Sequence, residues 1–468
     1  MTISYPPGAG MSRMFNLSSW KWALSAWRNL LHLPREAGVD DEIARNFPRN
    51  FVVNSLDSVS WILGDSFISI TTILPVYARH LTSSTLVIGL IPALADLGWF
   101  LPQMFMAPLV ERRPRKYPLV IGLGALERLP YLVLPFAVFW LNGLPRASAV
   151  GFFILLMAWK STSSGIVAIP WQEMIAKIIP VSHRGRFFGV SQLSGQVIGV
   201  AGAALAGLLL AHFAYPLNFA LCFGASAFGV WLSYFFLSQV REPARQVPPE
   251  GHARGQYGKR LLKILRSDAN FRTYLVSRWF SYLGGMATGF IALYAVIKYS
   301  LPDSTAGVFT GILFAAGAVG YLVWGPLGDR LGHKHVMELS ALLWAAALGT
   351  ALATAFFPMP WGLYLVFVLL GVSSAGNLLS DLSMAMEFGP EGERPTYIGL
   401  ARSLTGPALF IAPLLAGWVI QSYGYAVMFS VSLLFCLTGL WMLRQAVQDP
   451  RFLERGAISS LKPGGKSP

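Results

Sequence analysis

The sequence predicts an all-α membrane protein with twelve transmembrane helices, arranged as two six-helix bundles with pseudo-twofold symmetry. Three observations predict this fold class: the apolar composition, the number of long apolar runs and an internal repeat. The chain has 468 residues, of which 54% are hydrophobic and only 12% are charged. Soluble domains carry about 25% charged residues, so a chain this long and this apolar is expected to lie in a membrane.

Twelve apolar runs are long enough for spanning helices, which need about 20 mostly apolar residues. The first six are expected at 51–78, 86–109, 117–141, 149–175, 187–213 and 217–240. The second six are expected at 271–298, 306–327, 336–357, 362–386, 397–420 and 426–443. We therefore divide the chain into an N-terminal segment (1–49), a first bundle (50–240), a linker (241–269), a second bundle (270–446) and a tail (447–468).

The N-terminal segment contains a short amphipathic pattern rather than a cleaved signal. Apolar side chains recur at helical spacing at Trp20, Leu24, Trp27 and Leu31, while Lys21 falls elsewhere on the helical wheel. This pattern is typical of a helix that lies on the membrane surface. The linker is too short and too polar for a separate domain, and its last part has a similar amphipathic pattern.

The formal net charge of +14 has two explanations, nucleic-acid binding and retention of basic loops in the cytoplasm. If the N-terminus is cytoplasmic, the basic residues gather on one side of the membrane. The cytoplasmic loops then hold Arg112, Arg113, Arg115, Lys116, Arg184, Arg186, Arg330, Lys334 and Arg394, and the external loops hold Arg79, Arg146 and Lys298. This asymmetry favours a multi-pass protein of the cell (inner) membrane with both termini in the cytoplasm, in contact with lipid and not with nucleic acid.

Enzyme chemistry has no support in the sequence motifs. No HExxH, GxSxG or Walker pattern occurs, so we expect no catalytic residues and no cofactor. The two cysteines, Cys222 and Cys436, lie in apolar runs without metal-ligand spacing, which favours packing roles and no metal.

The two halves of the chain repeat. Residues from Asn50 read NFVVNSLDSVSWILG, and residues from Asn270 read NFRTYLVSRWFSYLG, at an offset of 270 − 50 = 220. Later in each half, PVSHRGRFFG starts at Pro180 and PEGERPTYIG starts at Pro390, at an offset of 390 − 180 = 210. Because each copy has an even number of spans, both enter the membrane in the same sense, as expected for a transporter built from parallel repeats.

A charged turn also occurs twice, as GPLGDRLGHK at 325–334 and as a degraded copy, APLVERRPRK, at 107–116. The complete copy resembles the signature of the major facilitator superfamily, and the resemblance covers the chain from about residue 50 to 443. It implies that these loops are conformational latches and that spans one, four, seven and ten line a central cavity. The latch residues it implies are Gly325, Asp329, Arg330, Gly332, Lys334, Glu111, Arg112 and Arg115.

Charged residues inside spans cost about 2.5–3.5 kcal/mol each on insertion scales, so they are candidates for function. The candidates for the substrate and proton pathway, on spans that the resemblance places around the cavity, are Asp57, Asp65, Lys160, Arg278, Asn377 and Asp381. We expect Asp65 to be able to pair with Lys160, and Asp57 to be able to face Arg278 across the two halves. The alternative role, ion pairs that hold a bundle together, is favoured for Asp96, Glu127 and Arg128.

The function expected from these features is secondary active transport of a small solute by alternating access, coupled to protons through a carboxylate in a low-dielectric cavity. Two alternatives stay open: an exporter or flippase of an amphipathic, lipid-like substrate, and a membrane sensor that transports nothing. We expect a monomer whose partners are its small-molecule substrate, protons and the bilayer.

Overall fold

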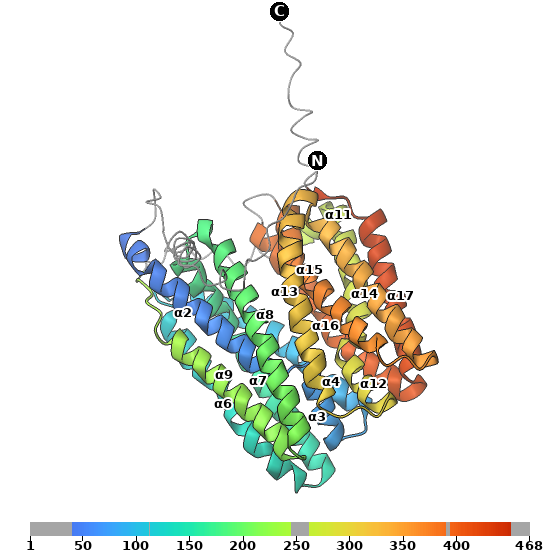
Figure 1. Ribbon diagram of the computed structural model, residues 1–468. Coiled ribbons are helices and arrows are strands. Elements are labelled where there is room, and N and C mark those ends of the chain that lie inside the picture. The colour runs from blue at the N-terminus through green and yellow to red at the C-terminus, as the bar shows by residue number, and fades with distance from the viewer. Residues whose placement is uncertain (1–39, 112, 245–261, 390–393, 451–468) are drawn as a thin grey trace, which may run out of the picture.

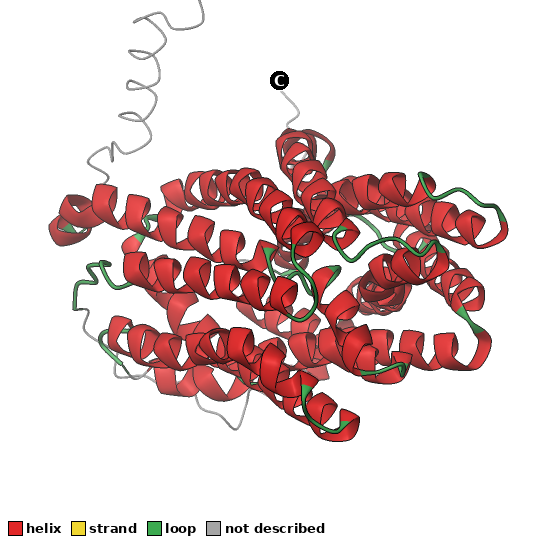
Figure 2. Ribbon diagram, turned by 60° about the horizontal axis from the view of Figure 1, so that its bottom comes forward, coloured by secondary structure: helices red, strands yellow, loops and turns green. Residues whose placement is uncertain are grey.

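The computed structural model describes residues 40–111, 113–244, 262–389 and 394–450 (Figure 1). The surface helix expected before residue 34, most of the linker, Arg112 and most of the tail lie outside the described residues. The described part of the chain consists of helices and loops without a strand, as Figure 2 shows. The all-α prediction is thus confirmed.

Both bundles have the predicted order of spans. The N-terminal bundle contains α2 (Asp41–Ser66), α3 (Ile73–Leu81), α4 (Thr85–Phe100), α5 (Gln103–Glu111), α6 (Tyr117–Asn142), α7 (Arg146–Ile178), α8 (Val181–His212) and α9 (Leu217–Leu237). The C-terminal bundle contains α11 (Ala269–Gly284), the 3₁₀ helix η2 (Gly285–Phe290), α12 (Ile291–Lys298), α13 (Thr305–Leu331), α14 (His333–Phe356), α15 (Gly362–Phe388), α16 (Arg394–Tyr423) and α17 (Tyr425–Gln445).

Ten helical segments in the described residues are long and apolar enough to cross a membrane, counting α11 to α12 as one. The other two predicted spans are broken helices: α2 with α3, and α4 with α5. Span seven is also distorted, because η2 interrupts it. The first span leaves the helix after Ser66, and 66 + 220 = 286 falls within η2, so the repeated spans are interrupted at equivalent points.

The internal repeat is visible in how the first and last helices of each bundle pack. A Cβ added to Gly229 on α9 would lie 2.7 Å from the backbone nitrogen of Gly64 on α2, so these backbones touch. In the C-terminal bundle, a Cβ on Gly439 of α17 would lie 2.8 Å from the nitrogen of Ser281 on α11. Since 439 − 229 = 210, the glycine is at the repeat-related position. Small residues allow this close approach of helices in lipid.

Each bundle is also closed by an asparagine at the start of its first span. The side chain of Asn50 donates to the carbonyl of Arg241 (2.8 Å) and accepts from its N–H (3.0 Å). Asn270 makes the same pair of bonds with Gln448, at 2.9 and 2.8 Å. The repeated Asn therefore ties the beginning of each bundle to the segment that follows its last helix. We call this paired contact the asparagine clasp.

The bundles meet along α4 against α16 and α8 against α13. We call the end of the molecule where α2 begins and α9 ends the linker end, and the opposite end the distal end. Contacts across the bundles gather at the distal end: Thr85 Oγ1 donates to the carbonyl of Gly417 (2.7 Å), and the Thr72 and Thr310 hydroxyls are 2.5 Å apart. There Asp303 also binds both Arg79 (2.8 Å) and His80 (2.7 Å).

The same helix pairs diverge toward the linker end. A Cβ on Gly307 of α13 would lie 2.4 Å from the nitrogen of Gly207 on α8, so the helices touch near the distal end. Toward the linker end, a Cβ on Gly189, Gly325 or Gly406 would meet no atom within 4 Å among the described residues. Figure 1 shows the bundles meeting near α3, α4 and α12 and separating above. The structure is closed at the distal end and open at the linker end.

Candidate functional site

The charged turn at 325–334 joins α13 to α14 through a single residue. Gly332 has a φ of 102°, a backbone conformation that glycine adopts without a steric penalty. Asp329 and Arg330 are exposed on the last turn of α13, and neither has an ion pair or hydrogen bond among the described residues. Lys334 contacts Glu338 at 3.3 Å on the next helix. Asp329 and Arg330 are therefore available to a partner in this conformation.

The degraded copy is held within its own bundle by Glu242, which sequence reasoning did not single out. One Glu242 oxygen accepts from the backbone N–H groups of Lys116 and Tyr117, each at 2.7 Å. Its other oxygen pairs with Lys177 at 2.8 Å. Glu242 directly follows span six, beside the basic loops, and that position was the only signal in the sequence. Glu111 is the last residue of α5.

Asp57 belongs to an ion cluster between α2, α6 and α9. Its Oδ1 accepts from the Ser233 hydroxyl at 2.5 Å and lies 4.0 Å from the guanidinium of Arg128. Arg128 also pairs with Glu127 at 3.2 Å and donates to the carbonyls of Val230 and Gly124. Asp57, Glu127 and Arg128 are all buried. The bundle-holding role expected for Glu127 and Arg128 is the one this geometry supports, and Asp57 takes part in it.

Asp65 of α2 and Lys160 of α7 are both partly buried. They are close enough to interact electrostatically, but no ion pair within 4.0 Å joins them. The Lys160 ammonium lies 5.3 Å from the centroid of the Tyr131 ring, a cation–π distance. Lys160 interacts electrostatically with Glu127 as well as with Asp65, and has an ion pair within 4.0 Å with neither of them among the described residues.

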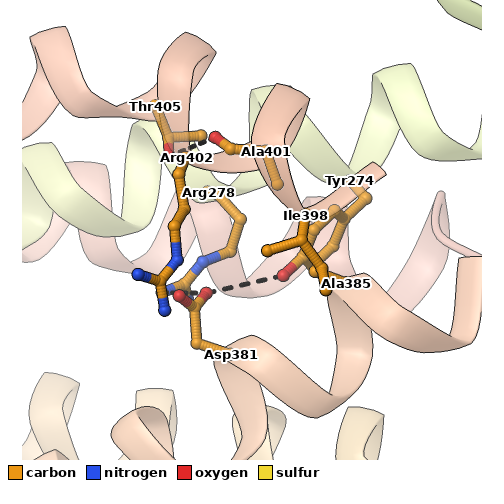
Figure 3. A pocket seen from close by; sticks show the side chains of 8 residues that line it. All are labelled: Tyr274, Arg278, Asp381, Ala385, Ile398, Ala401, Arg402 and Thr405. Atoms are coloured by element: carbon orange, nitrogen blue, oxygen red, sulfur yellow. Dashed lines mark hydrogen bonds and ion pairs between the residues drawn. The ribbon is translucent and has the colours of Figure 1, made fainter. Parts of the chain in front are cut away.

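In the C-terminal bundle, Arg278 and Asp381 form an ion pair at 3.0 Å between α11 and α15 (Figure 3). The Tyr282 hydroxyl donates to the other oxygen of Asp381 at 3.3 Å, and the Tyr282 ring lies 4.5 Å below the Arg278 guanidinium. Asn377, one turn before Asp381, accepts from Arg278 at 3.4 Å. The Arg278 side chain is only 6% exposed, whereas Asp381 is 34% exposed. Asp381 is therefore the more accessible member of the ion pair.

A second arginine reaches the same place. Arg402 of α16 lines a small pocket with Arg278, Asp381 and Thr405, and the cavity of about 10 Å³ has room for one water molecule. Figure 3 shows the Arg402 side chain extending along the pocket beside Arg278. Arg402 has no ion pair or hydrogen bond among the described residues. The pocket is thus lined by two guanidinium groups and one carboxylate, of which only Arg278 is paired with Asp381, so it carries a net positive charge.

The pairs that sequence reasoning suggested differ from those in the structure. Asp57 pairs with Arg128 and Arg278 pairs with Asp381, each within its own bundle, so Asp57 does not meet Arg278. The expectation that Asp96 belongs to a satisfied ion pair is wrong for the described residues, where this half-buried carboxylate has no partner. Arg402 was not among the candidates. As a charge inside a span it had a signal in the sequence, but span eleven is outside the spans that the resemblance places around the cavity.

A metal site requires several ligating side chains close together. Within the described ranges, no group of three His, Cys, Asp or Glu side chains could hold a metal ion.

The comparison with known proteins is consistent with the twelve-span architecture. Among curated relatives, the niacin transporter NiaP of Acinetobacter baylyi is 28% identical over 171 residues, which are 36% of this chain and 38% of that protein. The cis,cis-muconate transport protein of the same organism is 26% identical over 146 residues, 31% of this chain and 34% of the relative. The uncharacterised MFS-type transporter YuxJ of Bacillus subtilis is 25% identical over 291 residues, 59% of this chain and 70% of the relative.

Solved structures share the fold at low identity. A D-xylose-proton symporter aligns with a TM-score of 0.66 and 14% identity, over 86% of this chain and 98% of that one. The nucleoside transporter NupG aligns with a TM-score of 0.63 and 13% identity, over 84% and 98%. The family model described as Major Facilitator Superfamily matches residues 58–302 and 274–465, which together are well over half of the chain. The protein therefore belongs to the Major Facilitator Superfamily.

Proposed function

We propose that this transporter of the major facilitator superfamily moves a small organic anion by alternating access and couples the movement to protons. The observation that carries the proposal is the pocket lined by Arg278, Arg402 and Asp381, in which the one carboxylate is paired with Arg278 and leaves Arg402 without a partner. A net positive charge inside a membrane protein is costly unless an anion compensates it. A carboxylate or phosphate on the substrate would supply that anion.

The geometry suits a carboxylate in particular. Guanidinium groups bind carboxylates through two parallel N–H bonds, and Arg402 has all of its donors available. Asp381 is one-third exposed and occupies Arg278 in the absence of substrate. A substrate carboxylate would bridge the two arginines, while the Asn377 amide and the aromatic face of Tyr282 would contact its uncharged part. In the facing bundle, Lys160 lies on a span that lines the cavity in this family and would add attraction for an anion.

The names of two relatives support this substrate class. One is a transporter of niacin and another of cis,cis-muconate, and both compounds are small conjugated carboxylates. The matched regions cover 38% and 34% of those proteins, so they favour the class and not a particular compound.

Orientation and coupling complete the proposal. The basic loops at the linker end favour a cytoplasmic position for that end and for both termini. We place the protein in the inner membrane as a monomer. Asp65, beside Lys160, is the carboxylate on span one that is suited to carry a proton, because a protonated Asp65 leaves the Lys160 charge free for an anion. For the boundaries of the linker, the two bundles and the tail we retain the sequence-based prediction.

The test is solute uptake into proteoliposomes with an acidic exterior. We expect uptake of labelled nicotinate and benzoate, and none of nicotinamide or benzamide, which keep the ring and lack the charge. Arg278→Gln is expected to lower carboxylate uptake at least ~30-fold, because truncating one partner of a buried charge pair costs about 2–5 kcal/mol. Arg146→Gln, at the distal start of α7, is the matched control and should leave uptake unchanged.

Three results would contradict this proposal. Equal uptake of amides and carboxylates would show that the substrate does not need a negative charge. Movement of labelled phospholipid instead of either solute class would favour the lipid-like alternative. Tight binding without any flux would favour a sensor.

The two charged loops give a second prediction under alternating access. Asp329 is exposed and unpaired in this conformation, whereas the first loop is already held by Glu242. We expect Asp329→Asn to slow carboxylate uptake more than Glu111→Gln does, because Glu242 already holds the backbone of the first loop within its own bundle. The measurement is the initial uptake rate at equal protein content. Equal loss in both variants would show that the loops latch equally.

A further inference from the structure

Asp96 is the only charged residue of α4, and it lies on the face of α4 that meets the other bundle. Thr85 and Gly89 define that face, since Thr85 bonds to Gly417 and a Cβ on Gly89 would lie 2.5 Å from the carbonyl oxygen of Pro413. At about 100° per residue, Asp96 lies within roughly 20° of both on the helical wheel. Gly98, by contrast, is nearly opposite and packs on Ser161 of α7.

Arg402 lies on the corresponding face of α16. It is within roughly 60° of Pro413, Gly417 and Gly406 on the wheel. The antiparallel register set by the pairs 85 with 417 and 89 with 413 continues to 96 with 406, because each pair sums to 502. Arg402 is then one helical turn, about 5.4 Å, beyond the residue opposite Asp96, which is within the reach of its side chain.

The two groups are apart in the present conformation because the helices have already diverged. A Cβ added to Gly406 would meet no atom within 4 Å among the described residues, and Arg402 lines the pocket with Arg278. Neither Asp96 nor Arg402 has a hydrogen bond or ion pair among the described residues. Asp96 and Arg402 thus lie without partners on the facing stripes of α4 and α16, in the part of these helices that would come together when the linker end closes.

No other charged group competes for Asp96 from the elements packed against α4. On α7, Lys160 lies on the Tyr131 ring, Lys177 pairs with Glu242, Arg146 is the first residue at the distal end and Glu173 is an exposed acid. Arg79 and His80 of α3 are bound to Asp303 at the distal end. The single charge of α5 is Glu111 at its last residue, η2 carries none, and the other charge of α16 is Arg394 at its first residue. Arg402 is therefore the partner that the packing offers.

We propose that Asp96 is a proton-binding residue that opens and closes the linker end through Arg402. The inference rests on the alternating-access function proposed above and adds a second carboxylate, on the bundle interface, to it. With the linker end open, an unpaired charged carboxylate is costly in apolar surroundings, which favours the neutral acid. When Asp96 gives its proton to water at the linker end, the resulting carboxylate attracts Arg402 and the helices close. Taking up a proton breaks the pair and opens that end again.

The bound anion enters the same equilibrium. Arg402 can serve either the substrate in its pocket or Asp96 across the interface. A substrate carboxylate on Arg402 therefore opposes the Asp96 pair, so proton binding and anion binding both favour an open linker end. Two ligands that favour the same state bind cooperatively, which is the requirement for coupling.

Spin labels on the linker-end termini of α8 and α13 test this directly in the purified full-length protein without substrate. Val181 and Leu331 are 75% and 51% exposed, and neither lies on α4 or α16. Replacing both with labelled cysteine, in a background with Cys222→Ser and Cys436→Ser, gives a distance across the opening. We expect this distance to shorten as pH rises, because the charged form of Asp96 favours closure. Asp96→Asn, which mimics the neutral acid, is expected to keep the long distance at all pH values.

Arg402→Gln is expected to lose the same pH response, and the exchange of both residues, Asp96→Arg with Arg402→Asp, is expected to recover closure. Asp41→Asn, an exposed carboxylate at the start of α2, is the matched control and should respond as the parent does. A pH response that persists in Asp96→Asn overturns the proposal, and one lost only in Asp65→Asn assigns the proton to α2 instead. Because no substrate is present, the result does not depend on whether the transported solute is an anion.

Discussion

The Arg128→Ala variant is expected to be destabilised by about 3–5 kcal/mol, the cost of breaking a buried ion pair by removing one partner. Arg128 is 3% exposed and neutralises Asp57 and Glu127, which are buried beside it. It also donates to the carbonyls of Gly124 and Val230, so it joins α6 to α9 while Asp57 belongs to α2. Its loss leaves Asp57 and Glu127 buried without the cation that pairs with them.

Denaturation in detergent, followed by helical circular dichroism, measures this effect. Arg184→Ala is the matched control, since that arginine bonds to carbonyls near the start of α8 and is not part of the cluster. Combining Arg128→Ala with Asp57→Asn and Glu127→Gln should recover part of the stability, because no unpaired charge then remains. Loss of carboxylate uptake by Arg128→Ala at full stability would show that the cluster serves transport and not the fold.

The second large effect is expected from filling the space at Gly189 and Gly325. These glycines lie 207 − 189 = 18 and 325 − 307 = 18 residues from the Gly207–Gly307 contact, which is five helical turns on each helix. They therefore lie on the contact stripe of α8 and α13 and oppose each other when the linker end closes. Overpacking costs about 1–3 kcal/mol per site, so replacing both with leucine should lower the population of the linker-closed state at least ~tenfold.

Uptake and the spin-label distance between residues 181 and 331 report this effect together. We expect uptake to fall at least ~tenfold and the distance to stay long, while thermal stability changes little because both sites are open in the present structure. Gly151→Leu is the control, since a Cβ there also meets no atom within 4 Å and Gly151 is exposed on α7. Normal uptake by the double variant would show that α8 and α13 do not come together at this end.

Most of the fold followed from the sequence because its determinants are local or repeated. Apolar runs set the spans, and the offset between Asn50 and Asn270 revealed the duplication that both clasps confirm. The breaks in spans one and seven were not predicted, because a 3₁₀ turn or a bend inside an apolar run leaves its hydropathy unchanged. Glycine and threonine at these points, such as Thr288 bonding to the carbonyl of Gly285, are too common in membrane helices to serve as a signal.

The candidate site was predicted less completely. Arg278, Asn377 and Asp381 were placed on the correct spans, but their mutual pairing depends on how two helices distant in the chain are rotated. A helix that is apolar on all sides gives no periodic signal for that rotation. For the same reason Asp57 was assigned to the cavity, although the structure buries it beside Ser233 and Arg128. The relation between Asp96 and Arg402 becomes visible only when the register between α4 and α16 is known.

The asparagine clasp holds the entry and exit segments of each bundle next to each other, so that the chain forms a closed ring in each bundle. Asn50 and Arg241 adjoin in one ring, and Asn270 and Gln448 adjoin in the other. A unit of this kind can be duplicated in tandem without moving either end, because any polypeptide that exits beside its own entrance can be tethered to a copy. Lengthening such a tether costs little, roughly 0.6 kcal/mol for each doubling. An ancestral six-span gene would thus have needed only a duplication and an arbitrary stretch of coding sequence to yield the present chain.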